Sequence, residues 1–583
     1  MKRVKNRKMV NKPARITLAH INDTHSYFEP TSLQLHIEVE EDTVSPFVSA
    51  GGFARIATRI HQLREDAGRQ QRKLLFLHAG DCFQGTLYFS LFKGKANADM
   101  LNALGIDAMT LGNHELDMGN LPLAQFCQRI NFPLLAGNWQ LGDEVQDKPA
   151  TLKYNPRVYS HQPDGTARWL TKMVDGEPVA IFGLSLDLMA AIANPDPDTP
   201  FVDATATARA TVNAIRQQGI NKIILLSHLG YDADCELARQ VEGISIIVGG
   251  HSHRLQGDFS DLGLGKDDQY GIQIGQTYVV QAGYHALTLG HCDIDFAADG
   301  AVTSFTGKNE LLLGRRLFLN ANMDDEANDS CHGKACEFLN NHSNVVICKK
   351  DPDVQGLLVE RYLPRVRKMQ LEVIGNTEQP VRHVRIPDEL GPSELAPLVA
   401  ESFAYALNQR GCEVEFAIHN AGGVRSSLNA GDVTLSDVAG KLLPFMVPIG
   451  HYNIAGRYIA LALEGAINNA TNNGVTGTGS GSFPYTHNLD YVYHPDRPAG
   501  FRIADLQIYN SVDGWQPVDP DKKYRGSSSA YTMKGKEGFH ALLEMEHEGV
   551  VTELSMSDCF IEWLQSDPHR LNRHKIKKWY KGC

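Results

Sequence analysis

Short apolar runs that end abruptly in polar residues or glycine recur through the first half of the chain. Runs of this length and composition predict buried β-strands. The five that matter most are ITLAHIND (16–23), LLFLHAGD (74–81), AMTLGNHE (108–115), IILLSHLG (223–230) and ISIIVGGH (244–251). Apolar residues at helical spacing lie between several of them, as over 53–65 and 204–218. The pattern predicts an α/β domain with a largely buried sheet.

The pattern changes after residue 320. Residues 320–349 are polar and rich in Asn and Asp, which predicts a loop or a domain boundary. Over 351–370, apolar residues recur at helical spacing from Val354 to Leu363, and Asp351 or Asp353 is a candidate N-cap. We interpret 351–370 as a connecting helix that follows a first domain of residues 15–335.

Residues 371–565 mix the two kinds of pattern. Strands are predicted at 372–378, 415–422, 491–495 and 504–510, and helices at 395–408, 436–443 and 458–468. The run NNGVTGTGSGS between 472 and 482 is rich in Gly, Ser and Thr and predicts a flexible surface loop. This part of the chain is therefore predicted to be a second, smaller α/β domain.

Residues that can bind metal stand at the carboxyl ends of the five apolar runs, where ligands gather in layered α/β folds. One such motif is a weak signal, but five in series are very unlikely by chance. Two neighbouring divalent ions need a bridging carboxylate and several neutral imidazoles. Glycines 80, 112, 249 and 250 would let the chain turn sharply beneath a metal. The candidate metal-binding motifs are Asp23-x-His25, Gly-Asp at 80–81, GNHE at 112–115, Ser-His at 227–228 and GGHSH at 249–253.

The composition and charge of the chain argue against some classes of function. The chain has 583 residues, 42% hydrophobic and 21% charged, which is typical of a folded protein with more than one domain. Its formal net charge is −12, and basic residues form no long cluster outside the two ends, so polymeric nucleic acid is not an expected partner. A small phosphate ester is still a possible substrate, because bound metal ions can reverse the sign of the local electrostatic field. No run approaches the roughly 20 apolar residues of a membrane span.

Two further features concern the compartment. The first fifteen residues carry seven Lys or Arg, and no apolar stretch long enough for a signal peptide follows them. As it stands, this sequence predicts a cytoplasmic protein. The ten cysteines include no CxxC pair, and we expect most of them to be reduced. Cys331, Cys336 and Cys348 lie in a polar stretch where a disulfide could form if the protein were exported.

The order of the strand-end motifs resembles the calcineurin-like metallophosphoesterases and, more narrowly, the 5'-nucleotidase and UDP-sugar hydrolase family, over residues 16–300. The resemblance implies a four-layer sandwich that holds two divalent ions, with Zn, Mn, Mg or Co all compatible. Asp81 would bridge them, with Asp23, His25 and His253 on one ion and Asn113, His228 and His251 on the other. The split of His251 and His253 stays open, because some members have Gln or Asn at the position of His253. A periplasmic or secreted location, usual in the family, is the alternative to the cytoplasm.

The motif NHELD (113–117) supplies a candidate catalytic pair. In the family, the histidine of this motif points toward the phosphate and the aspartate orients it, which assigns these roles to His114 and Asp117. A positioned imidazolium suits the charge that develops during phosphoryl transfer. The alternatives are His114 as a further metal ligand and Asp117 as a carboxylate at a helix start.

A second stretch of resemblance, over about 375–550, concerns the substrate. HNAGGVR (419–425) resembles a family motif that binds substrate, LLPFMVPI (442–449) a segment ending in Pro-Phe, and GKEGF (535–539) a Gly-Gly-Asp-Gly-Phe loop. Phe445 and Phe539 would clamp a nucleobase between two rings. Lys536 and Glu537 depart from the family pattern. The predicted substrate residues are Arg382 (with Arg385 as the alternative), Asn420, Gly422, Gly423, Arg425, Phe445 and Phe539.

The resemblance implies hydrolysis of nucleoside 5'-monophosphates to nucleoside and phosphate by a monomer or homodimer. It also implies that the second domain swings to deliver the nucleotide, which makes 351–370 part of a hinge region. The alternatives are a UDP-sugar, NAD or other dinucleotide, or a 2',3'-cyclic nucleotide as the substrate of the same site. A nucleotide-binding protein without catalysis is a third hypothesis, against which the complete ligand set and the His114–Asp117 pair both argue. The structural alternatives for the substrate residues are Arg425 paired with a surface acid and two phenylalanines in a core.

Overall fold

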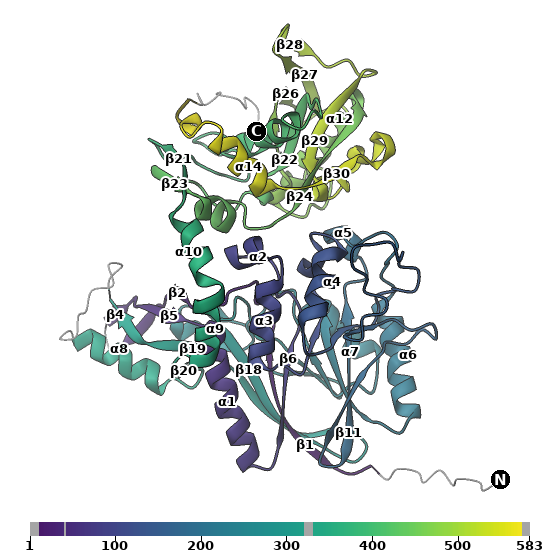
Figure 1. Ribbon diagram of the computed structural model, residues 1–583, viewed down its shortest axis with the longest axis vertical. Coiled ribbons are helices and arrows are strands. Elements are labelled where there is room, and N and C mark those ends of the chain that lie inside the picture. The colour runs from purple at the N-terminus through teal and green to yellow at the C-terminus, as the bar shows by residue number, and fades with distance from the viewer. Residues whose placement is uncertain (1–10, 40–41, 320–329, 574–583) are drawn as a thin grey trace. The chain divides into compact units, whose positions relative to one another are not determined.

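The computed structural model describes residues 11–39, 42–319 and 330–573. The chain divides into two compact units, one made of Met1–Gln84 with Phe92–Leu363 and the other of Gly85–Leu91 with Pro364–Cys583. Each unit has its own sheets and its own apolar core. This agrees with the expected two-domain α/β architecture (Figure 1).

The described part of the first unit contains two large mixed sheets. The first runs in the order β2 (Thr31–Gln34), β5 (Phe47–Ala50), β19 (Val302–Phe318), β18 (Thr288–Phe296), β1 (Ala14–Ile21), β6 (Lys73–His78), β7 (Ala108–Thr110), β8 (Leu134–Ala136) and β9 (Val158–Ser160), with β20 (Val345–Ile347) beside β19. The second runs β10 (Leu170–Val174), β11 (Glu177–Ser185), β12 (Lys222–His228), β13 (Ile246–Val248), β17 (Thr277–Val280) and β16 (Ile272–Ile274). All five predicted strands are present: β1, β6 and β7 in one sheet, β12 and β13 in the other.

The two sheets face each other across an apolar core. Leu18 and Leu77 of the first sheet and Ile224 and Val248 of the second are all 0% exposed and belong to one cluster. Both faces of each central strand are covered, which explains why these strands have continuous apolar runs instead of alternation.

Helices form the outer layers. On the second sheet lie α6 (Ala204–Gln217) and α7 (Tyr231–Gln240), which bury Val212 and Leu237 against it (Figure 1). Asp203 caps α6 by accepting a hydrogen bond from the backbone N–H of Ala206 at 2.6 Å. On the first sheet, α1 (Phe53–Arg69) packs against β1 and β6. The expected four-layer sandwich is therefore confirmed.

The prediction of a loop over 320–349 is wrong in its second part. Ser330–Asn341 forms helix α8, and Val345–Ile347 forms β20, which pairs in parallel with β19. Residues 320–329 lie outside the described part of the chain. Ala335 and Leu339 of α8 pack on the apolar cluster beneath β5 and β19. Two or three well-spaced apolar residues suffice to bury one face of a helix, even within a stretch that is polar overall.

The predicted connecting helix is present as two consecutive helices, α9 (Pro352–Arg361) and α10 (Leu363–Leu371). Asp351 is the N-cap, because its carboxylate accepts hydrogen bonds from the backbone N–H groups of Asp353 and Val354, both at 3.0 Å. Of the two capping candidates, Asp351 is therefore the one used. The division between the two units falls within this region, after Leu363.

The second unit is built around a sheet in the order β25 (Pro484–His487), β22 (Phe416–Asn420), β29 (Lys523–Ser529), β24 (Pro448–Ala455) and β30 (Val550–Ser555). One apolar cluster joins this sheet to α11 (Ala396–Asn408) and α14 (Met556–Gln565), and a second joins it to α12 (Gly456–Thr471). The predicted helix at 436–443 is present as a wide π-type turn, η4 (Asp437–Leu442).

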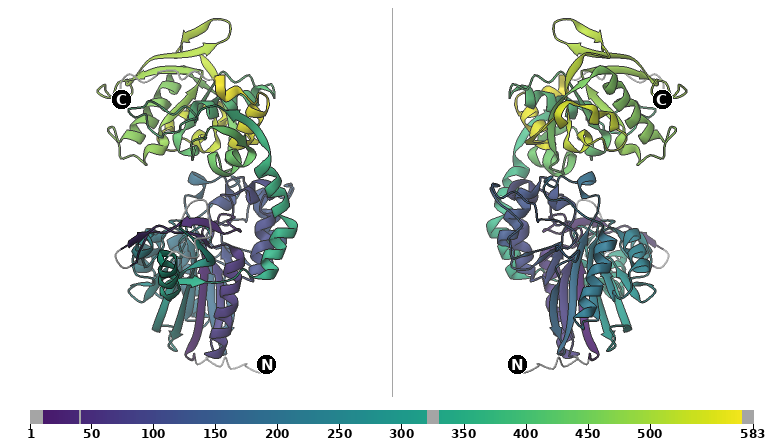
Figure 2. Two further views of the ribbon diagram at one scale, coloured as in Figure 1. Left: turned by 90° about the vertical axis from the view of Figure 1, so that its left-hand side faces the viewer. Right: turned by 90° about the vertical axis from the view of Figure 1, so that its right-hand side faces the viewer.

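Smaller sheets complete the second unit. β21 (Val373–Thr377) pairs with β23 (Gly431–Thr434), and β26 (Leu489–Tyr493), β27 (Ile503–Asn510) and β28 (Gly514–Pro517) form a three-stranded sheet. The hairpin of β27 and β28 projects from the body of this unit (Figure 2). The four strands predicted for this half are therefore confirmed.

Two expectations about the whole chain can be compared with the described residues. The nine described cysteines form no disulfide with one another, including Cys331, Cys336 and Cys348. In the part of the chain that the structure describes, we find no helix with the length and apolar character that crossing a membrane requires.

Candidate active site

Backbone hydrogen bonds join the loops that follow β1 and β6. The N–H groups of Asp23, His25 and Ser26 donate to the carbonyl oxygens of Gly80, Asp81 and Cys82 at 2.9, 3.1 and 3.0 Å. Because β1 and β6 are parallel neighbours, their carboxyl ends lie at the same edge of the sheet. This ladder fixes the first two predicted motifs side by side.

Glycine is required at two of these strand ends. A Cβ atom on Gly80, whose φ is +87°, would lie 2.5 Å from Nδ1 of His228, and one on Gly112 would lie 2.1 Å from Oδ1 of Asp81. Both distances are far below van der Waals contact. Glycine therefore allows the ligand-bearing side chains to reach the same point.

Several of the predicted ligands have backbones in the left-handed region, which non-glycine residues rarely adopt. Their φ angles are 48° for Asp23, 45° for His25, 58° for Asp81, 72° for His251 and 56° for His253. Each such residue costs on the order of 1 kcal/mol and persists only where its surroundings enforce it. The clustering of these residues at one place marks a functional site.

The first group of donor atoms comes from Asp23, His25 and His253, which lie within 4.8 Å of one another. Nε2 of His25 is 3.2 Å from Nε2 of His253, which is itself 3.3 Å from Oδ1 of Asp23. The other nitrogen of His25, Nδ1, lies 3.1 Å from the carbonyl oxygen of Phe83 and can donate to it. That bond favours the tautomer with a free Nε2, as in metal-binding histidines.

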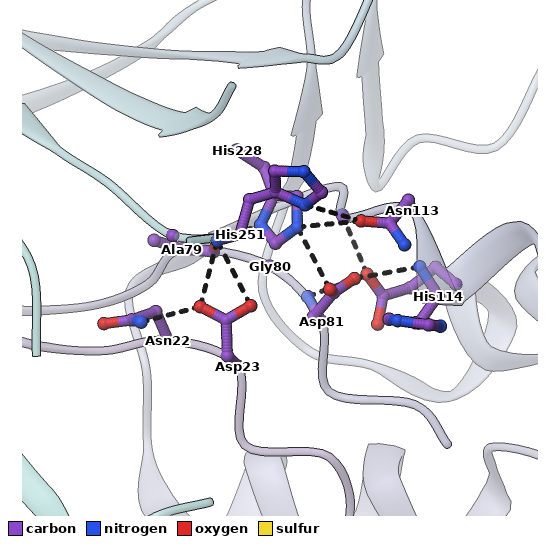
Figure 3. A network of polar contacts seen from close by, with 12 residues as sticks. Asn22, Asp23, Ala79, Gly80, Asp81, Asn113, His114, His228 and His251 are labelled. Atoms are coloured by element: carbon purple, nitrogen blue, oxygen red, sulfur yellow. Dashed lines mark hydrogen bonds and ion pairs between the residues drawn. The ribbon is translucent and has the colours of Figure 1, made fainter. Parts of the chain in front are cut away.

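The second group is formed by Asp81, His228 and His251, again within 4.8 Å. Oδ1 of Asn113 completes it, at 3.3 Å from Nε2 of His228 and 3.0 Å from Nδ1 of His251 (Figure 3). Nδ1 of His228 lies 2.7 Å from the carbonyl oxygen of Ala79, to which it can donate, so Nε2 is again left for a ligand.

Asp81 occupies the central position. It is 1% exposed, lies 3.1 Å from Nε2 of His228 through one oxygen, and shares a further donor group with His25 and His114. Burial raises the pKa of the Asp81 carboxyl, but His228 and His114 lower it further, and the result is well below the usual range. An ionised carboxylate between two donor groups suits a bridging ligand.

The donor set fits a pair of divalent ions. It combines buried carboxylates, imidazole nitrogens and one amide oxygen, the mixture that Zn and Mn accept readily. Four imidazoles and one amide make three close pairs, with the paired atoms 3.0–3.3 Å apart. Side chains gathered in this way suit the coordination of metal ions better than a hydrogen-bonded cluster alone.

His114 lies beside this centre and is held by Asp81 and Asp117, the second of which is itself held by Gln84. Its backbone N–H donates to Oδ1 of Asp81 at 2.9 Å, its Nδ1 lies 2.6 Å from Oδ2 of Asp117, and Gln84 Nε2 donates to the same Asp117 oxygen at 2.9 Å. Burial lowers the pKa of His114, but Asp117 and Asp81 outweigh it and raise the pKa to about 10. Asp117 therefore orients a protonated imidazole, and Gln84 is a partner that we did not identify from the sequence.

Glu115 is a second residue that sequence reasoning missed. Glu115 is 1% exposed. Its carboxylate accepts hydrogen bonds at 2.7–3.0 Å from the backbone N–H groups of four residues, which are Asp81, Cys82, Phe83 and Gly112. It thereby ties the loop after β6 to the loop after β7. A carboxylate in GNHE has no sequence signal that separates this role from a helix-start acid.

An aromatic rim borders the first donor group. The ring of Tyr284 stacks on His253 with centroids 5.2 Å apart, and His285 stacks on Tyr27 at 3.9 Å. The backbone N–H of His285 donates to the carbonyl of Asp23 at 2.8 Å. The segment that carries Tyr284 and His285 follows no predicted ligand motif, so sequence analysis gave it no role.

In the second unit, the motif at 419–425 forms a compact cluster. Asn420 ends β22, Gly422 and Gly423 lie in the turn that follows, and Nη1 of Arg425 donates to the carbonyl of Gly422 at 3.3 Å. The Arg425 guanidinium lies 5.5 Å from the centre of the Phe445 ring, which is half-buried. Five of the predicted substrate residues are therefore in one place.

The other two lie in different surroundings. Arg382 forms an ion pair with Asp388 and donates to the carbonyl of Gly391 at 3.2 Å. Phe539 is 1% exposed within the apolar cluster under α12, so its ring has no face open to a base in this structure. Arg385, the alternative arginine, lies close enough to Arg425 to lower the pKa of that guanidinium, after the larger effect of burial.

Tyr531 and Glu537 lie close to Asn420, one of the predicted substrate residues. Nδ2 of Asn420 donates to Oε2 of Glu537 at 3.3 Å, and the hydroxyl of Tyr531 also bonds to Glu537. Tyr531 is half-buried and lies in the short helix α13 (Ala530–Met533). Glu537 was noted only as a departure in the sequence, and Tyr531 was not singled out.

Comparisons with known proteins concern both units of the chain. The calcineurin-like phosphoesterase model matches residues 16–255, and the 5'-nucleotidase C-terminal domain model matches 373–544. The probable 5'-nucleotidase of Treponema pallidum is 30% identical over 97% of this chain and 93% of its own length. The NAD 5'-nucleotidase of Haemophilus influenzae is 29% identical over 96% of this chain and 91% of its own.

A solved structure of a relative is similar over the same length of chain. A structure of Haemophilus influenzae NAD nucleotidase, 29% identical, covers 96% of this chain and 97% of its own, with a TM-score of 0.62. Similarity therefore extends over both units and over nearly the whole length of these relatives. The chain belongs to the 5'-nucleotidase family of metal-dependent phosphoesterases.

Proposed function

We propose that this protein hydrolyses nucleoside 5'-monophosphates to nucleoside and phosphate. The observation that carries the proposal is the convergence of five strand ends on two donor groups with His114 beside them. Such a centre acts on a phosphoester, and the Asn420, Arg425 and Phe445 cluster of the second unit supports a nucleotide as the ester.

We assign two divalent ions to the centre. Asp23, His25 and His253 would hold one, Asn113, His228 and His251 the other, and Asp81 would bridge them. When bound, such ions stabilise the charge that develops on the phosphoryl group and make water a better nucleophile at neutral pH. Zn, Mn, Mg and Co are all compatible with mixed nitrogen and oxygen ligands.

In this proposal, side chains of the protein orient His114 and hold a proton on its imidazole. His114 presents Nε2 toward the centre, because its Nδ1 is engaged by Asp117. A protonated Nε2 can donate to a phosphate oxygen and stabilise charge there during the reaction. Gln84 holds the Asp117 carboxylate in place through a bond to the same oxygen.

For the substrate we propose that Arg425 binds phosphate or ribose oxygens and that Phe445 stacks on the base. Asn420, Gly422 and Gly423 shape the surrounding turn. Tyr531 supports the proposal as the second ring in place of Phe539, because it is half-buried and next to Asn420 through Glu537. Arg385 is favoured over Arg382 as the second arginine, since Asp388 engages Arg382.

A second candidate substrate is a dinucleotide such as NAD. Its support is the 29% identity to the NAD 5'-nucleotidase of Haemophilus influenzae over nearly the whole chain. The acidic Glu537 beside Asn420 is also a local difference that can alter the choice of base and sugar.

The test is a substrate panel. Purified protein, with and without added Mn²⁺, is assayed for phosphate or nucleotide release from AMP, UDP-glucose, NAD and 2',3'-cyclic AMP. We expect metal-dependent phosphate release from AMP at the highest kcat/KM. Release of AMP and nicotinamide mononucleotide from NAD at a higher kcat/KM would favour the dinucleotide instead, and no hydrolysis of any of the four would contradict both proposals.

A further inference from the structure

The second unit contains a cavity of about 550 Å³ that the predicted nucleotide residues do not line. Its walls come from the segments 377–381 and 392–398, the turn between β25 and β26, the β27–β28 hairpin and the chain at 571–572. None of Arg382, Asn420, Arg425, Phe445 or Phe539 is among its lining residues. The volume lies within the range of small-molecule sites.

Carboxylates dominate the charge of the lining, and its histidine, His487, lies 3.9 Å from Glu401 through Nδ1. Glu378, Glu394, Glu401 and Asp490 line the cavity, and none of the lining residues in the described part of the chain is a Lys or Arg. Glu378 and Glu394 form no ion pair with any described residue. Oε2 of Glu394 accepts a hydrogen bond from the backbone N–H of Arg382 at 2.9 Å, which fixes its position.

The amino end of α11 also lies at the cavity, through Pro397 and Leu398. A helix amino end carries about half a positive charge, which taken alone favours an anion. Four carboxylates outweigh it, and Ser393 already satisfies the N–H of Ala396 at 3.0 Å. The net field in the cavity therefore favours a cation and repels a phosphate group.

Aromatic rings form another wall. Tyr491, Tyr509 and Trp515 line the cavity, and the rings of Tyr509 and Trp515 lie 5.4 Å apart at 58° on the adjacent strands β27 and β28. Tyr509 is 40% exposed, so an aromatic surface is open at the hairpin. Ring faces attract cations, and most strongly those with a weakly hydrated charge, such as a quaternary ammonium or a pyridinium ring.

We propose that this cavity is a second binding site, separate from the nucleotide cluster, for a small organic cation with a delocalised or methylated charge. The aromatic wall contacts the cationic head, and Glu394 and its neighbouring carboxylates neutralise it. With four carboxylates and neither lysine nor arginine among its described lining residues, the cavity favours a cation over a nucleotide phosphate.

Titration calorimetry of the whole protein tests this, with N-methylpyridinium and choline as the two cationic probes. Their neutral counterparts, measured at the same neutral pH, are pyridine, which is unprotonated there, and 3,3-dimethylbutanol. AMP is the anionic control. We expect at least one cation to bind about tenfold more tightly than its neutral counterpart, with an affinity that falls as salt is added. The better of the two probes identifies the head group as flat or as tetrahedral.

Two variants locate the site. Trp515→Leu removes one ring, and Glu394→Gln keeps the shape and an acceptor but removes a charge. Each should weaken cation binding about five- to tenfold, whereas Tyr154→Leu, at a surface tyrosine of the first unit that is 69% exposed, should not. Trp515→Leu should also leave the kcat and KM for AMP unchanged, which separates this site from the proposed catalytic function.

Three outcomes would overturn the proposal. They are equal affinity for charged and neutral probes, cation binding unaffected by both variants, and displacement of the cation by AMP. A fourth concerns residues 574–583, which include four lysines. If the cation binds only after that segment is deleted, the cavity serves the chain's own terminus and not a free ligand.

Discussion

The metal centre of the first unit and the substrate cluster of the second differ in how tightly their residues are determined. In the first unit, all seven predicted ligands lie in two donor groups, locked by backbone ladders and by Glu115. In the second, Asn420, Arg425 and Phe445 gather, whereas Arg382 and Phe539 have other partners.

The difference follows from chemistry. A metal ion accepts few side-chain types and requires them at nearly fixed distances, so its ligands are recognisable at strand ends. A base and a sugar can be bound by many combinations of rings and donors, and the residues sit on loops whose course depends on packing. Substitutions should therefore have large, all-or-none effects in the first region and graded effects in the second.

The largest effect is expected from Asp81→Ala. Loss of the bridging carboxylate should remove at least one ion and lower kcat for AMP by about 10⁴-fold, since metal stabilisation of the transition state amounts to several kcal/mol. Metal content by mass spectrometry and phosphate release together check this. Asp66→Ala, at a surface helix position, serves as the control. Retention of both ions with normal turnover would contradict the bridging role.

His114→Ala should come next, with about a 10³-fold lower kcat and an unchanged metal content. The structural reason is that Nδ1 of His114 is engaged by Asp117, which leaves Nε2 for the proposed role at the phosphate. The exposed His61 provides a matched control in His61→Ala. If one metal equivalent is lost instead, His114 is a ligand, as its group with His25 and Asp81 would also allow.

The same contrast explains how much could be predicted from the sequence. The strands follow from apolar runs with polar ends, because burial restricts residue types. The four layers were implied by the family resemblance, and the assignment of the seven ligands stays a prediction, which the closeness of their side chains supports. Helix α8 was missed because residues 320–349 were interpreted together as one polar stretch, although the helix itself contains only Asn340 and Asn341 and is anchored by Ala335 and Leu339.

Glu115 and Tyr531 could not be predicted, for a different reason. The role of Glu115 exists only when the loops after β6 and β7 are adjacent and aim four N–H groups at one carboxylate. Which aromatic residue near 535–539 faces outward depends on α13, a helix of four residues capped by Ser529. Local sequence does not determine such long-range arrangements.

A smaller effect is expected from Glu115→Gln, which leaves two backbone N–H groups facing an amide N–H₂. Metal affinity should fall about 10- to 100-fold, as for other groups that position ligands, and the free energy of unfolding by about 2 kcal/mol. Metal titration and urea unfolding measure the two effects, and Glu236→Gln, on the exposed face of α7, is the control. Unchanged metal affinity would show that the two loops are held in place without this carboxylate.

The smallest effects concern the rings of the second unit, and they decide between Tyr531 and Phe539. Phe445→Ala and Tyr531→Ala should each raise KM for AMP about tenfold, since stacking on one base face is worth about 1–3 kcal/mol, and should barely change the KM of a small aryl phosphate.

Phe539→Leu should leave both KM values unchanged and lower only the free energy of unfolding, by about 1 kcal/mol, because Phe539 is 1% exposed in a core. Phe501→Ala, at a 72% exposed ring, controls for nonspecific effects. A rise in KM for AMP with Phe539→Leu but not with Tyr531→Ala would restore the Phe445–Phe539 clamp, and would mean that the α12 cluster opens when the nucleotide binds.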